Sequence, residues 1–255
     1  MTGYVLATEP NDLERRRMEL LFAYHGAVTI ELLEAAGVSD GWRCLEIGAG
    51  GGDITRWLAN RVVPGGTVVA VDIETHWLEP LQDDVVDVRR GDFGVLDFGL
   101  TRFNLVVAQM VLLHLPDPAE ACRRCVGLTV PGGQIVIHDV DFTPLAIPDA
   151  TTEEADGLAV MVDVMRAANI DVALGPKIAD LLEASGAIIE QVESRPADSA
   201  TDARIAAEIS AITIDRFRDR TAVPGASIDA AISALMNPSR RIIGPTRWVI
   251  RARVR

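Results

Sequence analysis

Apolar residues recur at two different spacings along this chain, and the spacing changes with position. Between residues 42 and 140, short runs such as VVAV and NLVVA are almost wholly apolar. Such runs are typical of strands that a parallel sheet buries on both faces. Between them, apolar residues recur at helical spacing, so the stretch predicts a doubly wound α/β fold with a mostly parallel sheet. The predicted strands are 42–47, 67–71, 85–89, 103–108 and 134–139, and the predicted helices are 53–61, 75–81 and 117–128.

Helical patterns also flank this region. Residues 11–36 have apolar side chains at helical spacing, with Asn11 or Asp12 as a cap at the start and Gly37 as a stop. Gly26 predicts a break into two helices within this stretch. After Asp141, the predicted helices are 152–168, 176–185, 202–218 and 226–236, and the predicted strands are 187–194 and 246–253.

The complete pattern predicts a seven-stranded sheet and two parts of the chain. We expect residues 1–40 to form an N-terminal helical cap and residues 41–255 to form the main domain. The last two predicted strands are separated by about 50 residues, whereas a simple hairpin needs roughly 2–5. We therefore expect a helical lid, insertion or oligomerisation element near 199–240. The helical stretch near 142–172 is expected to belong to the same lid or insertion.

Composition narrows the classes of partner. The chain of 255 residues has a formal net charge of -13, and nucleic-acid binding normally needs a basic surface, so we expect no nucleic-acid partner. We find neither an apolar signal segment at the start nor a charge-free run of the roughly 18 residues that a membrane span needs. Three cysteines do not form a disulfide framework. We expect a cytoplasmic protein without a membrane partner.

The candidate chemistry centres on the stretch CLEIGAGGGDIT, residues 44–55. A strand ends, glycines follow, and a helix begins, so backbone N–H groups and a helix N-terminus can face a ligand. The dinucleotide fingerprint G-x-G-x-x-G fails in both possible registers, because Asp53 or Thr55 stands where the third glycine belongs. The chain also contains no G-x-x-x-x-G-K motif, which excludes a P-loop.

What does fit is E-x-G-x-G-x-G, and with the segments that follow it this chain resembles the class I S-adenosylmethionine-dependent methyltransferases. Asp72 ends the second predicted strand, Gly91-Asp92-Phe93 follows the third, and FNLVVAQMVLLHLPDP and LTVPGGQIVIHD contain the fourth and fifth. The resemblance covers about residues 42–142. It implies a Rossmann-like sheet, S-adenosyl-L-methionine as cofactor, and residues 41–255 as the domain that binds it.

The resemblance also implies a role for each cofactor residue. The carboxylate of Glu46 would bind the ammonium of the methionine portion, the glycine-turn amides its carboxylate, and Asp72 the ribose hydroxyls. Asp92 and Phe93 would contact the adenine, and Gln109 the amino-acid portion or the sulfonium side. The full set of implied cofactor-binding residues is Glu46, Gly48, Ala49, Gly50, Gly52, Asp72, Ile73, Asp92, Phe93 and Gln109.

Three features need separate interpretation. Asn104 stands where the family usually has an aspartate at the start of the fourth strand, and we expect only a small effect on the turn. Cys122 and Cys125 have zinc-type spacing, but no further ligands are evident nearby, so we expect structural thiols and no metal. Asp139 and Asp141 share a face of the fifth strand and could line the pocket or cap loops.

The catalytic candidates are histidines. His114 follows the fourth strand, where ligands bind in such sheets, and is the first candidate for a general base; it could instead hold its loop. His25 in the predicted cap is the second candidate. For His138 on the fifth strand we expect a structural role, and for His76 a surface role.

We therefore predict an enzyme that transfers a methyl group from S-adenosylmethionine to a small organic acceptor by in-line displacement, driven by orientation with His114 as a possible base. A protein that uses the cofactor structurally, or for non-methylating chemistry, is the alternative. An NAD-dependent oxidoreductase is the third hypothesis. A homodimer is compatible with this sequence.

Overall fold

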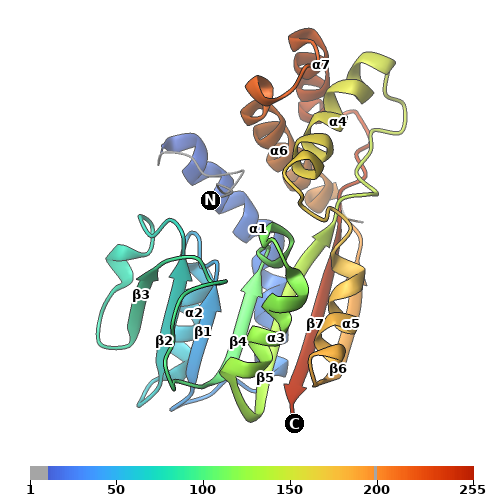
Figure 1. Cartoon of the computed structure of the whole chain (residues 1–255). Helices are drawn as coiled ribbons and strands as arrows, with labels where there is room; N and C mark the ends of the chain where they lie inside the picture. Colours follow the sequence, from blue (N-terminus) through green and yellow to red (C-terminus); the bar gives the residue numbers. More distant parts are fainter. Residues whose placement is uncertain (1–10, 198–199) are drawn as a thin grey trace. The chain divides into compact units, whose positions relative to one another are not determined.

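The computed structural model describes residues 11–197 and 200–255 (Figure 1). Within these residues seven strands form one sheet in the order β3-β2-β1-β4-β5-β7-β6. The predicted seven-stranded α/β sheet is therefore confirmed. The strands are β1 (Arg43–Ile47), β2 (Thr67–Asp72), β3 (Val86–Arg90), β4 (Phe103–Gln109), β5 (Thr129–Asp141), β6 (Ala187–Arg195) and β7 (Thr246–Val254).

Helices alternate with these strands along the chain. They are α1 (Asp12–Ala35), α2 (Asp53–Val62), α3 (Pro118–Leu128), α4 (Thr152–Ala167), α5 (Ile178–Ala184), α6 (Ala200–Arg216) and α7 (Gly225–Met236). Contacts join α2 to β1 and β2, and α3 to β4. Strands β1 to β5 pair in parallel in the order 3-2-1-4-5, and Figure 1 shows β7 running in the opposite direction to β4 and β5.

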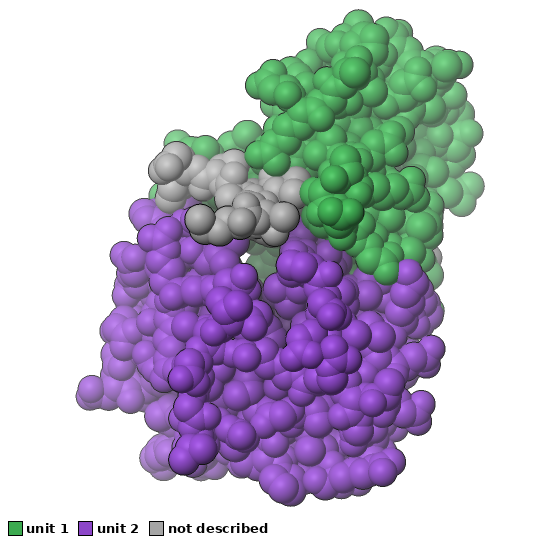
Figure 2. Space-filling model, viewed as in Figure 1, with its two compact units in different colours: residues 1–24, 140–173, 194–247 green, residues 25–139, 174–193, 248–255 purple. Residues whose placement is uncertain are grey.

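The described chain divides into two compact units (Figure 2). Unit 1 contains residues up to 24, residues 140–173 and residues 194–247, and unit 2 contains residues 25–139, 174–193 and 248–255. Residues 1–10 of the predicted cap lie outside the described residues, as does residue 199 of the predicted insertion. The expected division into a cap and a main domain stays a prediction.

Three predicted elements differ from the structure. Helix α1 runs unbroken through Gly26, because a single glycine costs only about 1 kcal/mol and buried neighbours such as Tyr24 and Val28 continue the helix's packing. Residues 75–81 form turns and a short 3₁₀ helix (Glu79–Leu81) instead of an α-helix, because Pro80 lacks the N–H that a longer helix needs. Strand β5 begins at Thr129, and an irregular register between Phe103 and Leu105 accommodates its Pro-Gly-Gly segment.

The core of unit 2 comes from strands that are apolar on both faces. Leu45, Val68, Ala70, Val106 and Val107 all have 0% exposure. Burial of each leucine or valine of this set contributes about 1.5–3 kcal/mol, and the alanine contributes less. Burial on both faces explains the nearly continuous apolar runs in the sequence.

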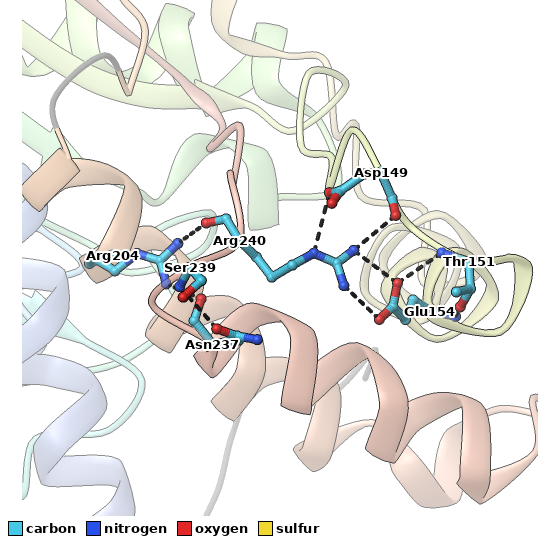
Figure 3. Close-up of polar contacts among 7 residues, drawn as sticks. All are labelled: Asp149, Thr151, Glu154, Arg204, Asn237, Ser239 and Arg240. Carbon is cyan, nitrogen blue, oxygen red and sulfur yellow. Dashed lines mark hydrogen bonds and ion pairs between the residues drawn. The ribbon is translucent and has the colours of Figure 1, made fainter.

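In unit 1 an arginine joins two segments that are distant in sequence. Arg240, which follows α7, contacts the side chain of Asp149 at 3.3 Å and both carboxylate oxygens of Glu154 at 3.0 Å (Figure 3). Glu154 also forms a capping box with Thr151 at the start of α4. From α6, Arg204 donates to the backbone oxygen of Arg240. This cluster joins the start of α4 to α6 and to the loop after α7.

Close backbone contact between α4 and α7 depends on Gly157. A Cβ at this position would lie 2.0 Å from the backbone oxygen of Ser227 and 2.8 Å from the Cβ of Ala231. Neither atom belongs to a flexible side chain, so a larger residue would force the two helices apart.

We predict that Gly157→Ala lowers the free energy of unfolding by about 1–3 kcal/mol through this overpacking. Gly127→Ala in α3 is the matched control, because a Cβ there meets nothing within 4 Å. Chemical denaturation followed by circular dichroism should show loss for Gly157→Ala and none for Gly127→Ala. Equal stability of the two variants would contradict the assigned α4–α7 contact.

Candidate functional site

The glycine turn connects β1 to α2 in unit 2, as the sequence predicts. Gly48, Gly50 and Gly52 have positive φ angles of 67°, 51° and 79°. The amides of Gly48 and Ala49 donate to the backbone oxygen of Val71 at 2.8 and 3.1 Å, and the amide of Gly52 donates to Ala49 at 2.9 Å. These bonds fix the turn against β2 and place Gly52 at the start of α2.

Two of these glycines also lack space for a side chain. A Cβ at Gly48 would lie 2.2 Å from Cγ2 of Val111, and a Cβ at Gly52 would lie 2.5 Å from Cδ1 of Leu81. Both positions therefore combine a positive φ with a steric limit, and each condition alone favours glycine.

Asp72 lies at the carboxyl end of β2 and holds the glycine turn in place. Its Oδ2 accepts from the amide of Gly50 at 2.8 Å, and its Oδ1 accepts from the amide of Glu74 at 3.0 Å. Burial raises the pKa of this carboxyl, against the opposing effect of backbone N–H groups including those of Glu74 and Gly50. The structure thus places Asp72 directly beside the turn that the sequence pairs it with.

Glu46 is a buried acid in the same place. Only 5% of the residue is exposed, and its Oε2 accepts from Thr55 Oγ1 at 2.5 Å. Burial, aided by the charges of Asp72 and Asp53, raises the pKa of Glu46 to about 8 in spite of the Thr55 bond. An acid in this environment gains most from a cationic ligand, because a cation favours its charged form. Sequence patterns did not predict Thr55 as the partner of Glu46. The signal that could have suggested it is a threonine two residues into the helix that follows the glycine turn.

The predicted adenine residues follow β3. Asp92 is exposed, and its Oδ1 accepts from the amide of Gly94 at 2.8 Å. Phe93 is 3% exposed, and its ring lies against Phe98 and under the guanidinium of Arg124, 5.1 Å from the ring centroid. The geometry therefore gives Asp92 easier access to a ligand than Phe93, and contact of either with adenine stays a prediction. Ile73 is half-buried just after β2, and its backbone oxygen accepts from Arg90.

Gln109 ends β4 and belongs to a buried polar cluster. Its Oε1 accepts from Thr29 Oγ1 at 2.5 Å, and the same Thr29 oxygen lies 2.8 Å from Nδ1 of His138. His138 Nε2 lies 3.0 Å from Nδ1 of His25. His25 is 2% exposed and His138 is 0% exposed, so the second catalytic candidate lies in the interior of unit 2 with a histidine partner. Sequence reasoning missed Thr29, although its place four residues after His25 puts the two on one helix face.

His114 lies in a short 3₁₀ turn (Leu112–His114) after β4. It is half-buried, and its backbone amide donates to Val111 at 2.9 Å. Between β4 and this turn, Met110 has a φ of 59°, which is rare for a residue with a side chain. The position agrees with the predicted one, and the role as a base stays a prediction.

Carboxylates of the fifth strand cap loops. Asp139 is 0% exposed, and its Oδ2 accepts from the amide of Leu113 at 3.1 Å. Oδ1 of Asp141 accepts from both the amide and the hydroxyl of Thr143. Of the two interpretations that the sequence left open, these bonds favour loop capping.

Other predicted features have structural contacts. The Asn104 Oδ1 accepts from the amide of Arg43 at 2.8 Å, a bond that an aspartate would also form. Cys122 and Cys125 are buried free thiols, and burial raises the pKa of both, that of Cys122 to about 12. Among the described residues no group of three or more potential ligands could hold a metal ion. His76 is exposed and has an edge contact with Trp77.

Within the described parts of the chain, no helix combines the length and the apolar character needed to cross a bilayer.

Residues 45–137 match the family described as "Methyltransferase domain". Two curated relatives are similar to this chain: methyltransferase str2 of Strobilurus tenacellus (31% identical, over 58% of this chain and 54% of the relative), and the ubiquinone/menaquinone biosynthesis C-methyltransferase UbiE of Pseudomonas savastanoi (30% identical, over 41% and 44%). The chain thus spans about half the length of these relatives. Among solved structures, the [4+2]-cyclase SpnF is similar in fold, with 17% identity, a TM-score of 0.59, and coverage of 89% of this chain and 80% of that one.

The raised pKa of Glu46 predicts a specific pH dependence of stability. A glutamate with a folded-state pKa of about 8, above its unfolded value, binds its proton more tightly in the folded state. The free energy of unfolding therefore falls as the pH rises from the unfolded pKa toward 8, and levels off above it. Glu46→Gln keeps an acceptor for Thr55 and removes the fall in the free energy of unfolding that the ionisation of Glu46 causes.

We predict that Glu46→Gln is more stable than the unsubstituted protein at pH 8.5, by an amount of the order of a few kcal/mol, and close to it at pH 5. Thermal unfolding of the ligand-free proteins from pH 5 to pH 9 measures the difference. Glu34→Gln is the control, because Glu34 is exposed on α1 and its removal takes no charge out of the interior. If the difference in stability between Glu46→Gln and the parent does not grow with pH, the raised pKa of Glu46 is contradicted.

Proposed function

We propose that this chain is a class I S-adenosylmethionine-dependent methyltransferase, and that it transfers the methyl group of S-adenosylmethionine to a small organic acceptor. The match of residues 45–137 to a methyltransferase domain and the similarity to two methyltransferases support the proposal. The observation that carries the proposal is the arrangement around the glycine turn, with the buried acid Glu46 before it and Asp72 bonded to Gly50. The methyltransferase match also supports S-adenosylmethionine over NAD, in agreement with the failed dinucleotide fingerprint.

The residues of the turn fit this cofactor. Glu46 is a buried acid that a primary ammonium would complement. Asp72 uses two of its roughly four acceptor positions on the amides of Gly50 and Glu74, so its carboxylate can also accept from the hydroxyls of a ribose. The turn amides of Gly48 and Ala49, by contrast, already donate to Val71. This favours another donor for the carboxylate of the methionine portion.

The cofactor supplies a methyl group activated by a sulfonium. The chain's own contribution is then orientation, exclusion of water and removal of a proton from the acceptor where it has one. His114, half-buried in the turn after β4, is our candidate for the base, and such a group contributes about 10²–10⁴-fold. His25 is the weaker candidate, because its ring is bonded to His138 in the interior.

A small organic acceptor is supported by charge and by the relatives. The net charge of -13 opposes binding of a phosphate backbone. UbiE is named as a C-methyltransferase of ubiquinone and menaquinone biosynthesis, and ubiquinone and menaquinone are small molecules. We keep the small-molecule acceptor, the absence of a nucleic-acid partner, the cytoplasmic location and a possible homodimer as parts of the proposal.

Non-methylating use of the cofactor is the alternative, since the fold of this chain is shared with a protein described as a [4+2]-cyclase. Two measurements separate the hypotheses. In a thermal-shift comparison, S-adenosylmethionine at 100 times its dissociation constant should stabilise the protein by about 2.7 kcal/mol, and NAD should not. Incubation with methyl-labelled S-adenosylmethionine and a panel of phenols, thiols, amines and carboxylic acids should then label an acceptor; tight binding with no labelling across the panel would favour the alternative.

For Asp72 we predict that Asp72→Asn binds S-adenosylhomocysteine at least about tenfold more weakly, because a charged acceptor for the ribose hydroxyls is lost. Isothermal titration calorimetry measures the affinity. Asp83→Asn is a matched control, since Asp83 also accepts from two backbone amides, those of Val85 and Val86, but in the turn before β3. Unchanged affinity of Asp72→Asn would remove Asp72 from the cofactor site.

For His114 we predict a loss confined to the chemical step. His114→Gln should lower kcat with a labelled acceptor by about 10²–10⁴-fold and leave the affinity for S-adenosylhomocysteine within about twofold. The exposed His76→Gln serves as control and should change neither quantity. If kcat of His114→Gln stays within about threefold of the parent, His114 is not the base.

A further inference from the structure

Three buried polar side chains of unit 2 and the half-buried Gln109 form one continuous chain of contacts. His25 and Thr29 lie one turn apart in α1, His138 lies in β5, and Gln109 ends β4. The contacts run from His25 Nδ1 to His138 Nε2 (3.0 Å), from His138 Nδ1 to Thr29 Oγ1 (2.8 Å), and from Thr29 Oγ1 to Gln109 Oε1 (2.5 Å). We call this set the histidine–glutamine relay. Thr29 and His138 are each 0% exposed, so the protein itself supplies their partners.

If Thr29 donates to Gln109, the donor and the acceptor of every other hydrogen bond in the relay are fixed. A threonine hydroxyl has one proton. Thr29 Oγ1 lies 2.5 Å from Gln109 Oε1 and 3.3 Å from the backbone oxygen of His25, so the shorter contact takes the proton. The contact with His138 then needs the proton on the histidine Nδ1. In the neutral ring, Nε2 of His138 is then an acceptor, and it receives the proton on Nδ1 of His25. Both histidines are therefore Nδ1–H tautomers, and each member donates to the next.

This direction decides which end of the Gln109 amide meets a ligand. The amide oxygen is held by Thr29, so the nitrogen, which carries two donors, is the end that a ligand can meet. Gln109 directly follows Ala108, which pairs with Ile47, the last residue before the glycine turn. The Gln109 side chain is thus anchored at the edge of the sheet where the turn begins.

We propose that the histidine–glutamine relay orients Gln109 to donate to the carboxylate of the methionine portion of S-adenosylmethionine, with His25, Thr29 and His138 as positioning residues. An amide N–H suits an anion and opposes a sulfonium cation. Of the two contacts that the sequence left open for Gln109, this favours the amino-acid portion over the sulfonium side. The turn amides of Gly48 and Ala49 already donate to Val71 and that of Gly50 to Asp72, which favours a donor from outside these three residues. The inference rests on the proposed cofactor.

The tautomers provide a test that needs no ligand. Long-range ¹H–¹⁵N correlation spectra of the whole protein should show His25 and His138 as neutral Nδ1–H tautomers. Thr29→Val, which keeps the side-chain shape and removes the hydroxyl, should shift the His138 resonances, and Thr29→Ser should restore them. An Nε2–H tautomer of His138 in the unsubstituted protein would overturn the relay.

A pair of ligands tests the carboxylate contact. S-adenosylmethionine and its decarboxylated form share the sulfonium and the amine and differ only in the carboxylate. By calorimetry, Thr29→Val should lower the affinity for S-adenosylmethionine by about tenfold and the affinity for the decarboxylated form by less than about twofold. Thr29→Ser should keep both affinities near the parent values. Thr213→Val is the matched control: this buried α6 threonine also bonds to a backbone oxygen four residues earlier, in unit 1.

Gln109→Glu is a second variant that keeps an acceptor for Thr29 and places a negative charge at the ligand. This variant should lower the affinity for S-adenosylmethionine by tenfold or more. Its affinity for the decarboxylated form should be unchanged or higher. Equal weakening of both ligands by Gln109→Glu, or by Thr29→Val, would overturn the carboxylate assignment. If the unsubstituted protein binds neither ligand, the proposed function fails, while the tautomers still test the relay by themselves.

Discussion

Contact between Gly48 and Val111 is the constraint on which the candidate site depends. No side chain fits at position 48, because a Cβ there would overlap Val111, and the φ of 67° excludes most residues independently. The glycine turn after β1 and the segment after β4 can therefore lie against each other. Since β1 is between β2 and β4 in the sheet, Asp72 and Gln109, the last residues of β2 and β4, lie on opposite sides of the strand that leads into this turn.

The site is held together by polar groups that have little access to water. Glu46 has Thr55, Asp139 has the amide of Leu113, and the relay links His25 to Gln109. A polar group left without a partner in such surroundings would destabilise the fold by about 1–3 kcal/mol. Each of these bonds therefore stabilises the fold mainly because it prevents that loss. Glu46 is the exception, because the Thr55 bond does not offset its burial and its pKa stays raised. A binding site is the natural place for such an uncompensated acid.

Sequence patterns predicted most of unit 2 because its strands are buried on both faces and their ends are marked by glycine or acidic residues. The glycine turn and Asp72 could be predicted for the same reason: each is a local feature of the chain. Gly26 and residues 75–81 were predicted wrongly, since packing outweighs a single glycine, and a proline overrides an apolar helical spacing. The sequence could suggest Thr29 and Thr55 only by their positions on a helix. Their partners, Gln109 and Glu46, lie 80 and 9 residues away, and the fold brings them together.

Asp72 and Glu46 show two ways in which a fold can prepare a carboxylate for a ligand. Asp72 receives two backbone amides, so its position is fixed before any ligand arrives, and its unused acceptor positions keep their direction. Glu46 is oriented by one hydroxyl and held in an environment that disfavours its charge. A neutral diol needs only the first kind of group, since it donates to an oxygen that is already in place. A cationic amine benefits from the second, because its arrival restores the charge that burial opposes. The two acids beside this turn are therefore suited to different ligand groups, Asp72 to a neutral hydroxyl donor and Glu46 to a cation.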